Sequence, residues 1–244
     1  MRLLLIALLF STLAHAAPPK TAAFAPVFEL AGIRLLCEQA APLVQRGLPD
    51  KQQAQLGNVF AADALCLDLA KRLASQLDKT QLQQAQRQLE SPLAQRFTAA
   101  ERLVGEGGAQ GLTAYREQLV ERPPREERRQ LVRRLDAAAH TTTLATLLRY
   151  EVGKTQAFLA LQGRGESIDE QALSTQTQAQ ENALRASSAE AVESFMLYAY
   201  RQMPSEQLAE YAALYEQPAV ALLLDSSAQV LPELFAARRA QLKK

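Results

Sequence analysis

Few residues of this sequence are of the types that carry out nucleophilic or metal-assisted chemistry. Beyond its first sixteen residues the chain has one histidine, His140, which three threonines follow. A Ser–His–Asp or Cys–His device needs a nucleophile and an orienting group around the imidazole, and a metal site needs several ligands at short spacing. Neither pattern occurs, so the sequence predicts no catalytic residue, no metal and no cofactor. His140 is expected to be an ordinary helical residue. Carboxylates that pair only in space, as in glycosidases, remain an alternative.

Cys37 and Cys66 are the only cysteines. Each lies in an apolar segment with helical spacing, and a connection between Gly47 and Gly57 would let the two segments face each other as a hairpin. The start of the chain predicts export to an oxidising compartment, where two thiols usually pair. We therefore expect a disulfide between Cys37 and Cys66, with two buried free thiols as the alternative. Their wide spacing argues against a redox-active pair.

The tyrosines are unevenly distributed, because four of the six lie between Tyr198 and Tyr215. Tyr211 and Tyr215 are four residues apart and so share one face of a helix. Rings with a polar tip suit a binding surface or a pocket wall, but core packing with hydroxyl groups that reach water explains the same pattern. Tyr198, Tyr211 and Tyr215 are the candidate residues for binding a ligand or partner.

Residues 125–134 contain five arginines, with Glu126 and Glu127 interleaved. The segment is either a patch for nucleic acid or lipid head groups, or a solvated helix face with i,i+4 ion pairs. We favour the second interpretation, since 27 basic residues against 26 acidic ones give no argument for a polyanionic partner. An exported protein also has little access to nucleic acid, so no nucleic-acid partner is expected.

The first residues have the pattern of a secretory signal peptide. Arg2 precedes an apolar run over residues 3–10, and His15 stands between Ala14 and Ala16 in an Ala-x-Ala end. We expect residues 1–16 to be removed and the mature protein to be periplasmic and soluble. The leader is too short for a membrane span, which takes about 20 residues, and so is the longest later apolar run at residues 219–224. No integral membrane span is therefore predicted.

The composition predicts an all-α fold. The chain has few glycines and no tryptophan, is rich in good helix formers, and lacks alternating strand patterns. We expect a bundle of about eight to ten helices, including one long helix over residues 124–161. Residues 17–26, with three prolines, are expected to be a flexible leader. Four glycines between Gly105 and Gly111 mark a linker over residues 105–123, which separates lobes at residues 27–104 and 124–244.

The two lobes share a weak internal repeat. Residues 81–97 and 207–224 align at an offset of 126 residues, which places Glu90 against Glu216 and Pro92 against Pro218. Proline clashes with the preceding helical turn and disfavours the α region for its predecessor. Each copy is therefore expected to be a helix, a sharp bend and a second helix.

These proline motifs resemble a family of exported bacterial helical proteins, a domain of unknown function called DUF 2059. The family has an aromatic pair, a small polar residue, Pro, a variable residue, Gly and a basic residue. The first copy keeps the pattern over residues 91–96, with Ala94 in place of Gly and Leu89 in place of an aromatic. The second keeps Tyr215 before Pro218 but has Val220 and Leu222 at the small and basic positions. The resemblance implies an all-α fold and an exported setting, and no established activity.

Three classes of function fit the sequence. The first is an exported binding or interaction protein, with an envelope protein or a small amphipathic ligand as partner and a groove between lobes or the tyrosine face as its site. The second is an envelope hydrolase with carboxylates paired in space, and the third is a structural or chaperone-like helical protein. A shallow apolar groove rimmed by polar residues would favour the first, a pocket with two close carboxylates the second, and a convex polar surface the third.

Overall fold

The protein was analysed as a computed structural model that describes residues 18–106 and 109–243, so the predicted signal peptide lies outside the described residues. Over these ranges the chain is helical and no strand occurs, which confirms the all-α prediction. The helices outnumber the eight to ten expected, because several expected helices are divided. They are η1 (Thr21–Ala23), α1 (Phe24–Leu30), α2 (Ile33–Gln45), α3 (Asp50–Val59), α4 (Ala62–Leu73), α5 (Lys79–Leu89), α6 (Pro92–Glu106), α7 (Ala109–Glu121), α8 (Glu126–Ala139), α9 (Thr141–Gly163), α10 (Glu170–Thr177), α11 (Ala179–Ala199), α12 (Ser205–Tyr215) and α13 (Pro218–Gln241).

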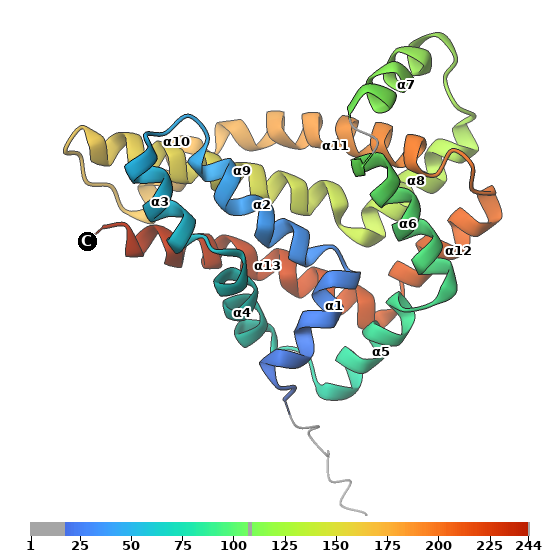
Figure 1. The fold of residues 1–244 in the computed structure, drawn as a ribbon, viewed down its shortest axis with the longest axis horizontal. Helices are drawn as coiled ribbons and strands as arrows, with labels where there is room; N and C mark the ends of the chain where they lie inside the picture. The colour runs from blue at the N-terminus through green and yellow to red at the C-terminus, as the bar shows by residue number, and fades with distance from the viewer. Residues whose placement is uncertain (1–17, 107–108, 244) are drawn as a thin grey trace, which may run out of the picture.

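The last helix, α13, runs through the middle of the molecule (Figure 1). It packs against α4 and α5 of the first half of the chain and against α9 of the second half, and α2 also packs against α9. Leu223 and Leu224 of α13 are fully buried in a core to which both halves contribute. Two separate pseudo-repeated lobes are therefore not confirmed.

Both Glu-x-Pro segments form the predicted bends. Helix α5 ends at Leu89 and Pro92 begins α6, while α12 ends at Tyr215 and Pro218 begins α13. Proline is tolerated at the first helical position because its missing N–H would be unpaired there in any case. Local sequence therefore determines where these two helix pairs turn.

By length and composition, α13 is also the one helix of the described chain that is apolar enough to cross a membrane. In this structure 56 % of its most apolar window is buried against the rest of the protein. Such burial is typical of a core helix. Arg238 and Arg239, near the end of the helix, are buried as well.

The long helix expected over residues 124–161 is divided at His140. This residue has φ 54° and ψ 24°, in the left-handed region, and it separates α8 from α9. The Asp136 carboxylate accepts hydrogen bonds of 2.7 Å from both the amide and the hydroxyl of Thr142. It thereby provides an acceptor for one of the amide groups in the first turn of α9. His140 Nε2 lies 2.9 Å from Asp225 Oδ1 of α13. The expectation that His140 is an ordinary helical residue was therefore wrong.

The expected leader and linker also differ from the structure. Residues 21–26 are helical, and Phe24 is fully buried, because the start of α1 packs against the core instead of forming a flexible leader. Within the expected linker, α6 continues to Glu106, and a short helix that the sequence predicts over residues 112–120 is present as α7, over residues 109–121. Helix α7 lies at the periphery of the molecule (Figure 1).

Candidate functional site

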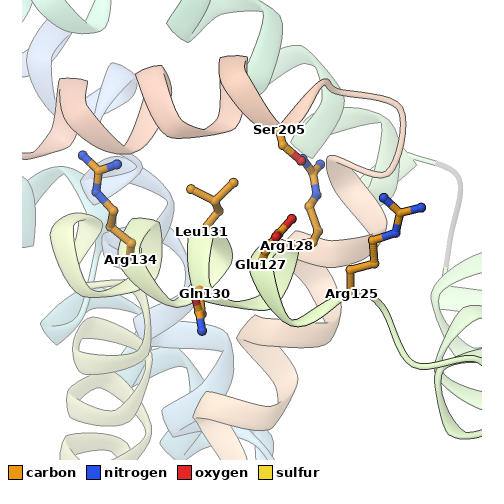
Figure 2. A pocket seen from close by; sticks show the side chains of 7 residues that line it. All are labelled: Arg125, Glu127, Arg128, Gln130, Leu131, Arg134 and Ser205. Carbon is orange, nitrogen blue, oxygen red and sulfur yellow. The ribbon is translucent and has the colours of Figure 1, made fainter.

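A groove lies between α8 and the beginning of α12, and we call it the α8–α12 groove (Figure 2). Pro124 precedes α8, and Pro204 occupies the N-cap of α12, so a proline marks the start of each helix. The groove encloses about 450 Å³. It is lined by Arg125, Glu127, Arg128, Gln130, Leu131, Arg134 and Ser205.

Three of the five arginines of residues 125–134 are neutralised by carboxylates. Arg129 bonds to Glu193 of α11 at 2.7 Å, and Arg133 pairs with Glu126. Arg134 makes a bidentate contact with Glu216, 2.6 Å at each oxygen. Glu216, the acid of the second Glu-x-Pro motif, thus joins the end of α12 to α8. These pairs agree in part with the predicted ion-paired helix face, although most of the partners come from other helices.

Arg125 and Arg128 differ from these three, because neither meets a carboxylate in the part of the chain that the structure describes. The half-buried guanidinium of Arg128 donates to the Tyr200 carbonyl oxygen at 2.6 Å and to Ser205 Oγ at 3.3 Å. Burial lowers the pKa of Arg128, since its acceptors are neutral and do not offset the lost hydration. The groove therefore contains a fixed, partly dehydrated cation.

Tyr200, whose carbonyl oxygen accepts the hydrogen bond from Arg128, belongs to a cluster of tyrosines and one glutamate. Tyr200 donates its hydroxyl proton to Glu101 Oε1 of α6 at 2.5 Å, and the hydroxyl oxygens of Tyr211 and Tyr215 are 3.2 Å apart. Phe97 stacks on Tyr211 with ring centroids 4.1 Å apart. Burial raises the pKa of Glu101, and the hydrogen bonds from Tyr200 and Tyr211 oppose that rise. The cluster is a hydrogen-bonded part of the core.

The structure places two of the three predicted tyrosines together and the third elsewhere. Tyr211 and Tyr215 are only 1 % and 8 % exposed, and their hydroxyl groups lie within hydrogen-bond distance of each other in the core. Tyr198 lies outside this cluster and packs against Tyr115 of α7, with Arg201 stacked 4.0 Å from its ring centre. A Cβ added to Gly111 of α7 would collide with the Tyr198 hydroxyl, so glycine allows α7 to approach α11 closely.

A second hollow, the α7–α11 groove, is lined by both apolar and polar side chains, and we call the polar ones its rim. It encloses about 500 Å³. Its apolar lining is formed by Leu119, Val120, Pro123, Pro124, Ala191 and Leu197. Its rim includes Arg116, which donates to Ser194 Oγ at 3.0 Å, and the ion pair of Arg129 with Glu193. Val120 is 85 % exposed, so this apolar surface is accessible.

Cys37 and Cys66 lie beside each other where α2 packs against α4, as the expected hairpin requires. Both are free thiols in this structure, so the predicted disulfide is not shown. A hydrogen bond from Cys37 lowers the pKa of Cys66, and nearby Arg34 acts in the same direction. No group of three potential metal ligands occurs among the residues whose positions are described.

Fold and surface together define an all-α protein with two adjoining grooves at the start of α8. Comparisons with protein-family models, curated proteins and solved structures find no match to this chain.

Proposed function

We propose that this protein is an exported, non-catalytic binding protein that accepts a small amphipathic ligand in the α7–α11 groove. The observation that carries the proposal is the lining of this hollow, in which apolar side chains, one of them open to solvent, occur together with polar and charged side chains. Binding sites for small molecules combine mainly apolar walls with a few positioned polar groups. An exposed apolar patch with a polar rim is also a common mark of an interaction site.

The rim is ordered by contacts between helices. Arg116 of α7 bonds to Ser194 of α11, and Arg129 of α8 bonds to Glu193 of α11. These contacts hold three helices around the groove, in whose lining Leu197 is buried and Val120 is exposed. An amphipathic molecule can therefore cover the apolar surface and keep its polar end among the charged rim residues.

Binding is tested with N-phenyl-1-naphthylamine, a neutral dye whose fluorescence rises in apolar surroundings. We expect saturable binding to the wild-type protein and about a tenfold weaker affinity for Val120→Glu, because a carboxylate on the groove wall must be dehydrated when the dye covers it. Leu67→Glu on α4 is the matched control, since Leu67 is also an exposed apolar residue but lies outside the groove. No saturable binding, or equal losses in both variants, would exclude the groove as the site.

Export is supported by the basic start, the apolar run and the Ala-x-Ala end of residues 1–16. Amino-terminal sequencing of protein from the soluble envelope fraction should begin at Ala17. Recovery of the chain in the cytoplasm with Met1 still attached would contradict export and leave the dye experiment unaffected.

A further inference from the structure

We propose that the α8–α12 groove binds a phosphate group, with Arg125 and Arg128 as its charged ligands and Ser205 as a hydroxyl ligand. This site goes beyond the proposed amphiphile site, because it has a different lining and a different chemistry. Figure 2 shows the side chains of Arg128 and Arg134 on the side of α8 that faces α12, with Ser205 next to the Arg128 guanidinium and Arg125 just before the start of the helix.

The charge balance of the groove favours an anion. Arg134 is neutralised by its bidentate contact with Glu216. Arg125 and Arg128 then leave two positive charges in the lining, against the single carboxylate of Glu127. The remaining positive charge is concentrated in a hollow, where it interacts more strongly with an anion than on an open surface.

Arg128 is already held in position for an oxyanion. Its hydrogen bonds to the Tyr200 carbonyl and to Ser205 use two of the five N–H donors of a guanidinium. The remaining donors meet no protein acceptor within the described ranges. A planar guanidinium with free donors matches the oxygen geometry of phosphate, and little side-chain entropy remains to be lost because the group is already fixed.

The first turn of α12 adds donors at the same place. Pro204 is its N-cap and provides no side-chain cap, so the amide groups that begin this eleven-residue helix receive no hydrogen bond from the side chain of their N-cap residue. Ser205 is the first residue of α12 and also lines the groove. A phosphate between Arg128 and Ser205 would therefore lie near the positive end of the helix dipole, and this end supports the arginine site.

Glu127 lies on the groove wall and gives the proposal a second, opposite test. Its carboxylate repels a bound phosphate, whereas Arg125 and Arg128 attract one. Removing the charge of Glu127 should therefore tighten phosphate binding, while removing either arginine charge should weaken it. Non-specific attraction of phosphate to the net charge of the protein would not distinguish neighbouring residues in this way.

A phosphate group can belong to a free phosphate ester or to a lipid head group, so the experiment uses both. One arm titrates the full mature protein with glycerol phosphate by calorimetry at low salt. The other measures cosedimentation with phosphatidylcholine vesicles that contain phosphatidylglycerol, against vesicles of phosphatidylcholine alone.

In the arm that shows binding, Arg125→Gln and Arg128→Gln should each weaken affinity by about tenfold, and Glu127→Gln should strengthen it about twofold to threefold. Arg133→Gln is the matched control, since it removes an arginine charge from the same helix but lies outside the groove. Among the described residues the Arg125 side chain makes no hydrogen bond or ion pair, so its variant is informative even if loss of the Arg128 contact to Tyr200 impairs folding.

The site is supported if, in either arm, affinity is weakened by Arg125→Gln and Arg128→Gln and strengthened by Glu127→Gln. The arm that shows this binding identifies the source of the phosphate. Binding in neither arm would overturn the proposal, and so would losses in Arg125→Gln that equal those in Arg133→Gln. Dye binding to the α7–α11 groove is unaffected by either result, so the two proposals fail separately.

Discussion

Replacing Arg239 by methionine is expected to lower the free energy of unfolding by about 3–5 kcal/mol, because it leaves a buried carboxylate without its main partner. Arg239 is only 1 % exposed at the end of α13. Its guanidinium bonds to Glu151 of α9 at 2.6 Å and to Glu170 of α10 at 2.5 Å. Glu151 is also 1 % exposed, and after the substitution its nearest cation would be Lys154, at 3.4 Å.

The loss should depend on pH in a definite direction. Burial raises the pKa of Glu151, and the charges of Arg239 and Lys154 oppose that rise. Removing Arg239 raises the pKa of Glu151 further, so in the folded variant the protonated form of Glu151 is favoured over the carboxylate. A pKa that is higher in the folded state means that stability is retained at acid pH and is lost as the pH rises through that pKa. Urea unfolding at pH 4 and pH 7.5 should show the larger difference from wild type at pH 7.5.

Two further variants separate this effect from the loss of any arginine. Adding Glu151→Gln to Arg239→Met should recover part of the stability, because the uncompensated charge is removed. Arg72→Met, which breaks the exposed pair of Arg72 with Glu233 at 2.8 Å, should lower the stability by less than about 1 kcal/mol. Equal losses in Arg239→Met and Arg72→Met would contradict the role assigned to the buried cluster.

The parts of the fold that could be predicted depend on local sequence. The all-α class follows from composition and from the helical spacing of apolar residues, and the bends at Pro92 and Pro218 follow from the missing N–H and the ring of proline. The division at His140 was missed because apolar spacing continues through it. The signal available was Asp136, whose carboxylate caps the helix that begins at Thr141.

The contacts that organise the site connect distant segments and leave no local pattern. The high density of tyrosines in the sequence around Tyr200 indicated this residue. The acceptor of its hydroxyl hydrogen bond, Glu101, lies 99 residues earlier and could not be identified. The density of arginines was visible in residues 125–134. Which of them lack a carboxylate depends on Glu193 and Glu216, which are 64 and 82 residues from their partners. The sequence therefore indicated a basic segment but could not identify Arg125 and Arg128.

Buried charge was the least predictable feature. Glu151 lies three residues after Leu148 and four before Thr155, on the face expected to point inward, and this position was a usable signal. Its partner Arg239 is 88 residues away within the same expected lobe, too far along the chain for local spacing to pair the two. Packing of α13 against α9 brings these groups together.

Oxidation of Cys37 and Cys66 to a disulfide is expected to raise the free energy of unfolding by about 3–4 kcal/mol, because the bond closes a loop of about 30 residues in the unfolded chain. The thiols already lie beside each other across the contact between α2 and α4. The lowered pKa of Cys66, due to the hydrogen bond from Cys37 and the charge of Arg34, favours the thiolate that begins exchange with an external disulfide. With oxidised glutathione, the two thiols lose two electrons and two protons while the oxidant becomes two molecules of reduced glutathione.

The experiment compares denaturant unfolding of the mature protein after treatment with oxidised glutathione and after treatment with dithiothreitol. Mass spectrometry after alkylation counts the free thiols in each sample. Oxidised protein should have no alkylatable thiol and the higher midpoint, while the Cys37→Ser/Cys66→Ser variant should respond to neither reagent. Protein taken from the soluble envelope fraction without reductant should already match the oxidised form. Two alkylatable thiols in that protein would overturn the predicted disulfide and leave the cysteines as packing residues, with Cys37 buried in the core and Cys66 half-buried.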